Sequence, residues 1–454
     1  SRLTMTPSLY RLFRLSYRLQ RWLNRRFTSA GLLLLVCLLV ALFLGGDTNN
    51  SLIYQILAFL TALLLLAIGN SLVFRYRFQA SRVLPRFGTV GVPLKYRVLI
   101  HSQSRQPQVN LRLMEEFVDP RPSFKELRET PEPLEDKRLA VDRALGYYRW
   151  LWLIGRKQGA TVKPVDLPLL PPQRSTEVSV ELLPLHRGIV RFRGLTLARP
   201  DPLGLMLACR TIALPQSLLI LPKLYQLPAI ALPGLRRYQS GGVALASSVG
   251  DSEEFRSLRE YRPGDSPRKI HWKSWAKTGK PIVKEEQDEF FVRHALILDT
   301  FQTEPYSEIF EAAISIAASF ACEVQTQESL LDLMFVGLEA YCFTFGRGLS
   351  HTDKMLEILA SVVACRDKSF AELIPRVIER LPLLSGCICV FLTWDEQRQA
   401  LVRQLQAMRL PTLVLVVAAN PDHLDLQTMA ALQDAQTQLQ VLSIDRLQEQ
   451  LLSL

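Results

Sequence analysis

Two apolar runs near the N-terminus, residues 30–45 and 52–74, constrain the fold of this chain more than any other feature. Neither run contains a charged residue, and a short polar stretch separates them. A bilayer core about 30 Å thick takes roughly 20 apolar residues to cross as a helix, in which every backbone amide is paired. The second run meets this length, and the first is at the short end. We therefore expect residues 29–74 to form a transmembrane helical hairpin.

Arginine residues flank the two apolar runs. Seven of them, with no acidic residue between, precede the first run: Arg2, Arg11, Arg14, Arg18, Arg21, Arg25 and Arg26. Four more follow the second run: Arg75, Arg77, Arg82 and Arg86. Because lysine and arginine are retained on the cytoplasmic side of membrane segments, both termini should lie in the cytoplasm. Residues 1–28 then form a basic amphipathic segment that suits the anionic headgroups of membrane lipids.

Net charge and cysteine usage exclude two classes of protein. Removing the seven N-terminal arginines from the net charge of +11 leaves +4, and no aromatic-interleaved basic motif indicates nucleic-acid binding. The seven cysteines are odd in number and form no C-x-x-C pair, which fits a reducing cytoplasm and gives no disulfide framework. Cys387 and Cys389 alternate within an apolar run, so we expect them to fill one face of a buried strand.

Residues 75–240 have the pattern of a β-rich, sandwich-like domain. Alternating apolar and polar residues typical of half-buried strands occur at 94–100, 109–113, 177–183 and 189–197. An insertion near 119–160 interrupts the pattern and begins with a loop, rich in proline and charge, at 119–138. Its aromatic stretch, residues 147–154, either packs against the sandwich or touches the membrane interface, where Trp and Tyr are enriched.

From residue 293 onward, short apolar strands alternate with helical stretches. We expect strands at residues 294–299, 332–338, 340–345, 387–392, 412–418 and 439–444. We expect helices at residues 306–324, 352–365, 371–380 and 396–408, followed by a short terminal helix. Strands that alternate with helices of about ten residues or more predict a parallel sheet covered on both faces. Residues 293–454 should therefore form a doubly wound α/β domain.

A charged motif occupies residues 241–292, between these two parts. Its basic residues, Arg256, Arg259, Arg262, Arg268 and Lys273, alternate with the acidic residues Glu254, Glu260 and Asp265. Arginine pairs with carboxylates through two parallel hydrogen bonds, so the pattern indicates an ion-pair network, with Trp272 and Trp275 as apolar cover. Such a network either clamps the two domains structurally or forms a docking surface for an acidic or C-terminal segment of a partner.

The run from Leu258 to Lys273, L-R-E-Y-R-P-G-D-S-P-R-K-I-H-W-K, resembles the signature of the bacterial domain-of-unknown-function 58 family. The upstream piece D-P-L-G-L at residues 201–205 and the order of the parts along the chain resemble that family too. The resemblance implies a C-terminal fold similar to the von Willebrand factor A domain and an anchor in the bacterial inner membrane. It also implies a MoxR-type AAA+ ATPase as partner, often with a transglutaminase-like membrane protein encoded nearby.

The same resemblance implies a magnesium site, because von Willebrand A domains often hold Mg²⁺ through a D-x-S-x-S loop plus a Thr and an Asp. Here the first loop is D-T-F-Q-T at residues 299–303, so Asp299 and Thr303 match while Phe301 cannot coordinate. Thr352 and Asp395 are the candidates from the later loops. Losing a ligand should weaken binding of a cation that requires near-octahedral geometry. Alternatively, Asp299 caps loop amides and Asp395 begins a helix.

We expect a membrane-anchored interaction protein that works with a MoxR-type ATPase in the assembly, maturation or stress protection of envelope proteins. Its partner surface would comprise Arg259, Asp265, Arg268, His271, Trp272 and Lys273. The alternative is an enzyme, a hydrolase or ligase acting on envelope precursors, with Asp265 and His271 as acid and base. The sequence contains neither a phosphate-binding loop nor a nucleophile elbow. We therefore expect no catalytic residue and, apart from possible Mg²⁺, no cofactor.

Overall fold

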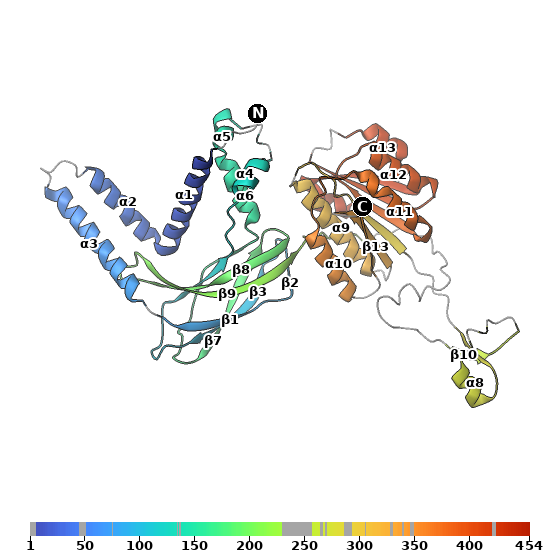
Figure 1. Cartoon of the computed structure of the whole chain (residues 1–454), viewed down its shortest axis with the longest axis horizontal. Coiled ribbons are helices and arrows are strands. Elements are labelled where there is room, and N and C mark those ends of the chain that lie inside the picture. The colour runs from blue at the N-terminus through green and yellow to red at the C-terminus, as the bar shows by residue number, and fades with distance from the viewer. Residues whose placement is uncertain are drawn as a thin grey trace. The chain divides into compact units, whose positions relative to one another are not determined.

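The computed structural model describes residues 6–44, 51–74, 76–133, 135, 138–228, 257–263, 267, 270–285, 293–304, 306–326, 330–337, 340–345, 349–419 and 424–454. The chain divides into two compact units, residues 1–223 and 224–454, whose elements are labelled in Figure 1. Both units contain sheets, as expected. The domain limits expected at 240/241 and 292/293 lie outside the described residues and stay predictions.

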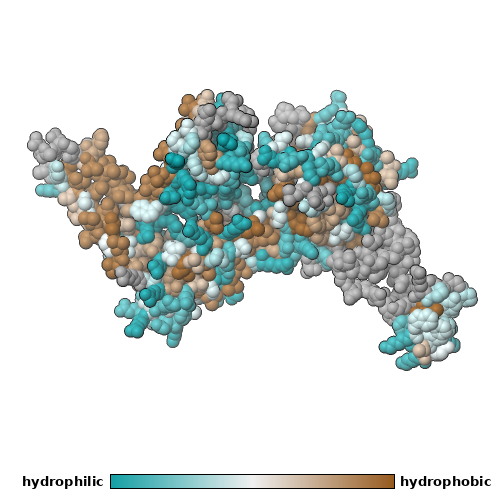
Figure 2. Space-filling view, viewed as in Figure 1, coloured by the Kyte–Doolittle hydropathy of each residue, from teal (hydrophilic) through white to brown (hydrophobic). Residues whose placement is uncertain are grey.

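Three helices open the first unit: α1 (Pro7–Arg26), α2 (Ser29–Leu44) and α3 (Ser51–Val73). α1 ends because the backbone of Phe27 is extended and bridges Met206. Leu32 and Leu35 of α2 share an apolar cluster with Leu64 and Ile68 of α3, so the two helices pack side by side. Figure 2 shows that the surface of this helix pair is almost entirely apolar.

Of the described helices, α3 is the one long and apolar enough to cross a membrane, over residues 52–73. The 16 residues of α2 fall short of the roughly 20 that a crossing takes. Almost none of the apolar window of α3 is buried against protein, which fits side chains that face lipid. Membrane association through α3 is thus supported. The two-helix crossing and the cytoplasmic position of both termini stay predictions.

Two sheets pack face to face in the rest of the first unit. The first has the order β1-β3-β7-β5: β1 (Phe78–Val83), β3 (Leu94–Ser102), β7 (Ser175–Pro184) and β5 (Ala160–Val162). The second has the order β2-β9-β8-β4-β6: β2 (Phe87–Thr89), β9 (Leu207–Leu221), β8 (Gly188–Pro200), β4 (Arg112–Phe117) and β6 (Val165–Asp166). Alternate residues of facing strands, such as Val98, Val180 and Leu195, fill the common core. The expected strand at 109–113 is displaced, since β4 begins at Arg112.

The insertion, which lies between β4 and β5 in the sequence, is helical. It contains α4 (Phe124–Glu129), α5 (Ala140–Leu145) and α6 (Tyr147–Lys157). The aromatic stretch forms α6, and its Trp150, 2% exposed, lies in one cluster with Leu127 of α4 and Phe13 of α1. The buried side chains of this stretch thus pack against α1 and α4, and contact of residues 147–154 with the membrane interface stays a prediction. Sequence periodicity did not reveal the packing of α6 against α1 because the two helices are far apart along the chain.

The second unit has a six-stranded sheet of order β14-β13-β12-β15-β16-β17. Its strands are β12 (Arg293–Leu298), β13 (Leu330–Val336), β14 (Ala340–Phe345), β15 (Gly386–Phe391), β16 (Thr412–Ala418) and β17 (Thr437–Ser443). All pairings are parallel except β13 with β14. The connection from β13 to β14 is too short for a crossover, so a wholly parallel sheet was a wrong expectation. Cys387 and Cys389 are buried in β15, as predicted.

Helices cover both faces of this sheet (Figure 1). They are α9 (Glu308–Thr326), α10 (Leu349–Ser361), α11 (Ile374–Arg380), α12 (Glu396–Ala407), α13 (Leu426–Leu432) and α14 (Leu447–Leu452). Val377 of α11, Leu401 of α12 and Met429 of α13 share a core with the strands on one face. The apolar runs of the central strands, buried on both faces, account for the doubly wound arrangement.

The described part of the signature segment is a two-stranded antiparallel ribbon with one short helix. β10 (Ser257–Glu260) pairs with β11 (Ile282–Glu285), and α8 (Trp272–Thr278) lies between them in sequence. The backbone N–H of His271 donates to the carbonyl of Ile282 at 2.8 Å, which fastens the start of α8 to β11. The ribbon is thus a local unit in its own right.

Candidate functional site

The carboxyl ends of β12 and β15 meet where the strand order reverses, a position at which open α/β sheets commonly bind ligands. Asp299 directly follows β12 and is fully buried. Its Oδ1 accepts the backbone N–H of Phe301 at 3.1 Å, and its Oδ2 accepts that of Leu392 at 3.0 Å. Asp299 therefore caps loop amides and fastens the ends of two neighbouring strands.

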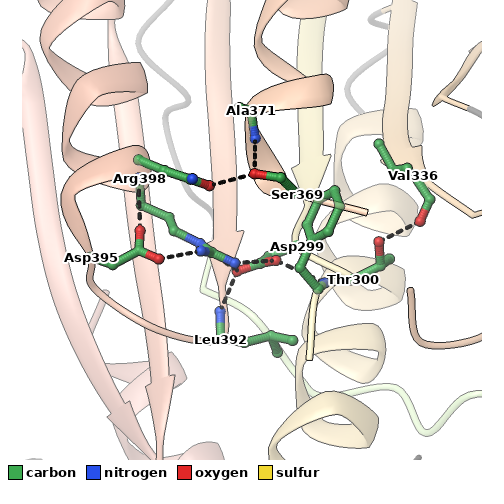
Figure 3. Close-up of polar contacts among 10 residues, drawn as sticks. Asp299, Thr300, Val336, Ser369, Ala371, Leu392, Asp395 and Arg398 are labelled. Atoms are coloured by element: carbon green, nitrogen blue, oxygen red, sulfur yellow. Dashed lines mark hydrogen bonds and ion pairs between the residues drawn. The ribbon is translucent and has the colours of Figure 1, made fainter. Parts of the chain in front are cut away.

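The carboxylate of Asp299 faces a guanidinium from the first turn of α12 (Figure 3). Nε and Nη2 of Arg398 donate to the two oxygens of Asp299 at 3.0 Å each, the two-pronged geometry that Arg and a carboxylate favour. Nη1 of Arg398 donates to Asp395 at 2.5 Å, and the side chain of Arg398 is only 6% exposed. The guanidinium also lies 4.4 Å from the ring centre of Phe370. This cluster of Asp299, Asp395 and Arg398 is called the edge triad below.

The edge triad is a closed electrostatic unit. Burial raises the pKa of Asp299, while Arg398 and the two backbone N–H groups oppose that rise. Asp395 serves at the same time as the N-cap of α12, since its Oδ1 accepts the backbone N–H of Arg398 at 3.0 Å. With four donors on Asp299 and two carboxylates on Arg398, the triad is suited to hold a loop rigidly rather than to exchange protons.

Of the expected magnesium ligands, Asp299 and Asp395 meet on Arg398 and Thr303 lines the adjoining pocket, but the arrangement leaves no place for a cation. Each oxygen of Asp299 already accepts two hydrogen bonds, and Arg398 lies where a cation would be held. Thr352 lies in the first turn of α10, which follows β14, and because β14 is antiparallel to β13 its carboxyl end lies at the opposite edge of the sheet from Asp299. Within the described ranges, His, Cys, Asp and Glu form no group of three that could hold a metal. The residues present do not fit Mg²⁺.

A pocket of about 520 Å³ opens beside the edge triad. Its wall includes the exposed side chain of Thr303, the fourth residue that the resemblance placed at a metal site. Two cations, Arg366 and Lys368, line the pocket as well. Among the residues whose contacts are described, no ion pair involves Arg366, and Lys368 lies 3.5 Å from Glu372. The buried Nε2 of Gln302 has no hydrogen-bond partner in the same part of the chain. The pocket therefore offers several donors to a ligand rich in acceptors, alongside the carboxylates of Glu304 and Asp395.

The signature segment holds the other predicted residues. Asp265 and Arg268 lie outside the described residues. Trp272 and Lys273 are exposed on the first turn of α8, where Trp272 stacks on Trp275 with ring centres 5.3 Å apart. Because Trp272 is 66% exposed, it does not act as apolar cover within the described segment.

The polar contacts of the signature segment are short-range. Nδ1 of His271 lies 2.7 Å from Oγ of Ser274, and Nη1 of Arg259 donates to the carbonyl of Glu260 at 3.2 Å. Lys280 pairs with Glu260 at 2.9 Å on the exposed surface. These contacts stabilise the ribbon locally, and the assignment of this surface to a partner stays a prediction.

Arg398 is the site residue that the sequence pattern did not indicate. One signal was present, since a cation in the first turn of a helix opposes the helix dipole and requires a carboxylate nearby. Asp395, three residues earlier, is one such partner. The second, Asp299, is 99 residues away in the sequence, and only the fold brings it into contact.

Residues 257–451 match the family described as protein of unknown function DUF58, which confirms the resemblance inferred from the signature. A curated relative, the uncharacterized protein YeaD of Bacillus subtilis (strain 168), is 28% identical over 206 residues, which are 45% of this chain and 50% of that protein. The chain thus spans about half the length of the curated relative it matches.

Two solved structures of a GH20 exo-β-N-acetylglucosaminidase from Vibrio harveyi, one with N-acetylglucosamine and one of an inactive mutant, also match. Each is 8% identical, has a TM-score of 0.13, and covers 80% of this chain and 60% of its own. A likeness at that TM-score carries no argument about fold or activity.

Proposed function

We propose that this chain is a membrane-anchored interaction protein whose α/β domain binds a partner protein at the carboxyl edge of its sheet. The observation that carries the proposal is the pocket beside the edge triad. Its wall combines Arg398, which Asp299 holds rigidly from beneath, with two further cations, Arg366 and Lys368. A rigid scaffold that presents donors and positive charge suits recognition of an acidic side chain or a chain terminus.

The family resemblance suggests the identity of the partner. We assign the role to a MoxR-type AAA+ ATPase that acts with this protein in the assembly, maturation or stress protection of envelope proteins at the bacterial inner membrane. A von Willebrand factor A-like fold is part of the same proposal, and the strand order with one antiparallel edge strand is compatible with it. In such domains a metal receives the partner's carboxylate, and in this chain the cations beside Arg398 would take that role.

A binding measurement with purified proteins tests the proposal. A MoxR-type AAA+ ATPase would be titrated into the full chain in detergent, once with the unchanged protein and once with the double variant Arg366→Glu/Lys368→Glu. Reversing two charges at the contact should weaken binding about tenfold or more, with stronger salt dependence in the unchanged protein. Arg403→Glu is the matched control, because Arg403 is exposed on α12 outside the pocket. Equal affinity of the double variant and the control would contradict the proposed site.

A further inference from the structure

A second pocket, of about 310 Å³, lies in the first unit between α1, the segment after β4 and strand β9. Its lining is rich in arginine. The arginines that line it are Arg18, Arg21, Arg25, Arg26 and Arg121. Thr211 of β9 contributes a hydroxyl to the wall, and Tyr17 and Trp22 contribute aromatic rings. This arginine pocket is separate from the partner-binding edge proposed above, and the two inferences can fail independently.

Positive charge in the arginine pocket exceeds the carboxylates that face it. Glu116 pairs with Arg25 and lies 3.9 Å from Arg21. Asp119 accepts a hydrogen bond from Nε of Arg121 at 2.6 Å. The remaining two arginines of the lining, Arg18 and Arg26, take part in no ion pair among the described side chains. Two carboxylates therefore face five guanidinium groups.

Two further observations favour an anionic ligand in the arginine pocket. Nη1 of Arg121 is buried without a hydrogen-bond partner among the residues that the structure describes, and a buried unpaired donor is costly. Burial, followed by the charges of neighbouring arginines, lowers the pKa of Arg25. An anion bound among these side chains would give Nη1 of Arg121 an acceptor and would offset the positive charge around Arg25.

We propose that the arginine pocket binds a phosphate group. The planar guanidinium matches the oxygens of a phosphate through paired, charge-assisted hydrogen bonds, and several guanidinium groups around one anion provide the charge it needs. A carboxylate offers fewer acceptor oxygens to so many donors. The phosphate can come from a lipid headgroup or from a soluble compound, and the surroundings of the pocket favour the lipid.

The surface of α1 places the arginine pocket at a lipid interface. Leu12, Leu15, Leu19 and Trp22 follow one another at helical spacing and are 50–62% exposed, which leaves an apolar ridge along α1. Arg11, Arg14, Arg18, Arg21 and Arg25 form a basic stripe at the same spacing beside it. A helix with an apolar ridge next to a basic face lies in the headgroup region of a membrane.

α1 does not continue the line of the helix pair. α1 joins α2 at the end of the helix pair that contacts the sheet, and it turns away from the pair rather than continuing along it (Figure 1). If α1 lies along the membrane surface, the arginine pocket at its C-terminal half lies at the level of the headgroup phosphates.

Calorimetric titration of the full chain in a non-ionic detergent tests the proposal. The ligands are short-chain phosphatidylglycerol, the matching diacylglycerol without phosphate, and inorganic phosphate. Arg18→Gln and Arg121→Gln should each weaken binding of phosphatidylglycerol about five- to tenfold, as loss of a charged hydrogen bond predicts. Arg11→Gln is the matched control, because it removes the same charge from the same stripe outside the pocket, and it should leave the affinity unchanged.

The ligands separate the two sources of phosphate. Tighter binding of phosphatidylglycerol than of inorganic phosphate supports a lipid headgroup, whereas equal affinities support a soluble phosphate in the same site. Arg18 is exposed, so Arg18→Gln should fold even if Arg121→Gln does not. Binding of the phosphate-free lipid as tight as that of phosphatidylglycerol would overturn the proposal. So would equal losses in Arg11→Gln and Arg18→Gln, since diffuse charge alone would then explain them.

Discussion

At the scale of single residues, the edge triad contains two buried charges, those of Asp299 and Arg398, and each depends on the other as its partner. Asp299 and Arg398 are almost completely buried, and each supplies the other with a two-pronged contact. Removing one partner of such a pair leaves the other charge buried and unpaired, which costs about 3–5 kcal/mol. Replacing both partners with neutral groups costs much less.

We predict that Arg398→Met lowers the stability of the α/β unit by about 3 kcal/mol or more. The double variant Asp299→Asn/Arg398→Met should recover a large part of this loss, because no buried charge is left unpaired. Native-state hydrogen exchange of the amides in β12 and β15 measures the change within this unit. Arg403→Met, on the exposed face of α12, is the control and should cost little. A loss below about 1 kcal/mol in Arg398→Met would contradict the closed electrostatic unit.

His294 gives a pH-dependent prediction. Burial lowers the pKa of His294 from its usual 6.5 to about 4, and neither ring nitrogen has a hydrogen-bond partner among the described residues. The unfolded chain therefore binds a proton before the folded chain does, so stability is complete above pH 6.5 and is lost as the pH falls toward 4. We expect a loss of about 2 kcal/mol between pH 7.5 and pH 5 from this residue.

The variant His294→Leu isolates this contribution. Other groups titrate over the same range, so the measured quantity is the difference in denaturation midpoint between the two proteins at each pH. As the pH is lowered, the denaturation midpoint of the unchanged protein should fall more than that of His294→Leu. The same difference in midpoint at pH 7.5 and at pH 5 would show that His294 does not cause the loss of stability at low pH.

At the scale of elements, α1 is attached to the insertion by an aromatic contact. Trp150 of α6 lies with ring centres 5.8 Å from Tyr10 and 5.9 Å from Phe13, both on α1. The Tyr10 contact is edge-on and the Phe13 contact is tilted, and aromatic contacts of this kind add to the burial of apolar area. The arginine pocket depends on this contact, because it fixes the helix that supplies most of its lining.

We predict that Trp150→Ala destabilises the packing of α1 on α6 by about 3–5 kcal/mol, the usual cost of emptying a large buried site. Faster hydrogen exchange and proteolysis confined to α1, α4 and α6 would show the loss of this packing. Leu151→Ala is the control, since Leu151 is 43% exposed on the same helix and should change little. Unchanged protection of α1 in Trp150→Ala would mean that other contacts hold the helix.

At the scale of the whole molecule, the apolar helices decide on which side of a membrane the two units lie. If α2 and α3 both cross, the two ends of the chain share one side, and the arginines on either flank place that side in the cytoplasm. If α3 alone crossed, α1 would lie across the membrane from α6, which is incompatible with the packing of Phe13 of α1 against Trp150. These two topologies make different predictions for the same reporter pair.

We predict that reporters fused before α1 and after Leu454 are both active in the cytoplasm and inactive outside it. Replacing Arg75, Arg77 and Arg86, which follow α3, with glutamine should weaken this preference, because positively charged residues hold the flanks inside. Arg82 is left unchanged because it is buried and paired with Glu115. A carboxyl-terminal reporter active only outside the cytoplasm would contradict the two-helix crossing.

Local sequence pattern was sufficient for most of the elements. The strand at Thr412–Ala418 and the strand at Ala340–Phe345 have the predicted limits, because short buried strands are continuous apolar runs bounded by polar residues. α12 was predicted to within one residue, since Asp395 marks its start. The direction in which strands pair was harder to predict from the sequence. β14 runs antiparallel to β13 because the connection between them is short, and hydrophobic periodicity carries no information on that length.

By itself, the sequence determined the apolar helices, the β-rich and α/β parts, and the signature that assigns residues 257–451 to a family. Those properties depend on residues close together in the chain. Only the tertiary structure decided that Arg398 occupies the place of a cation beside Asp299, and that arginines of α1 meet Arg121 in one pocket. Both arrangements join residues about 100 positions apart, and their energy arises from burial and charge, which no local pattern records.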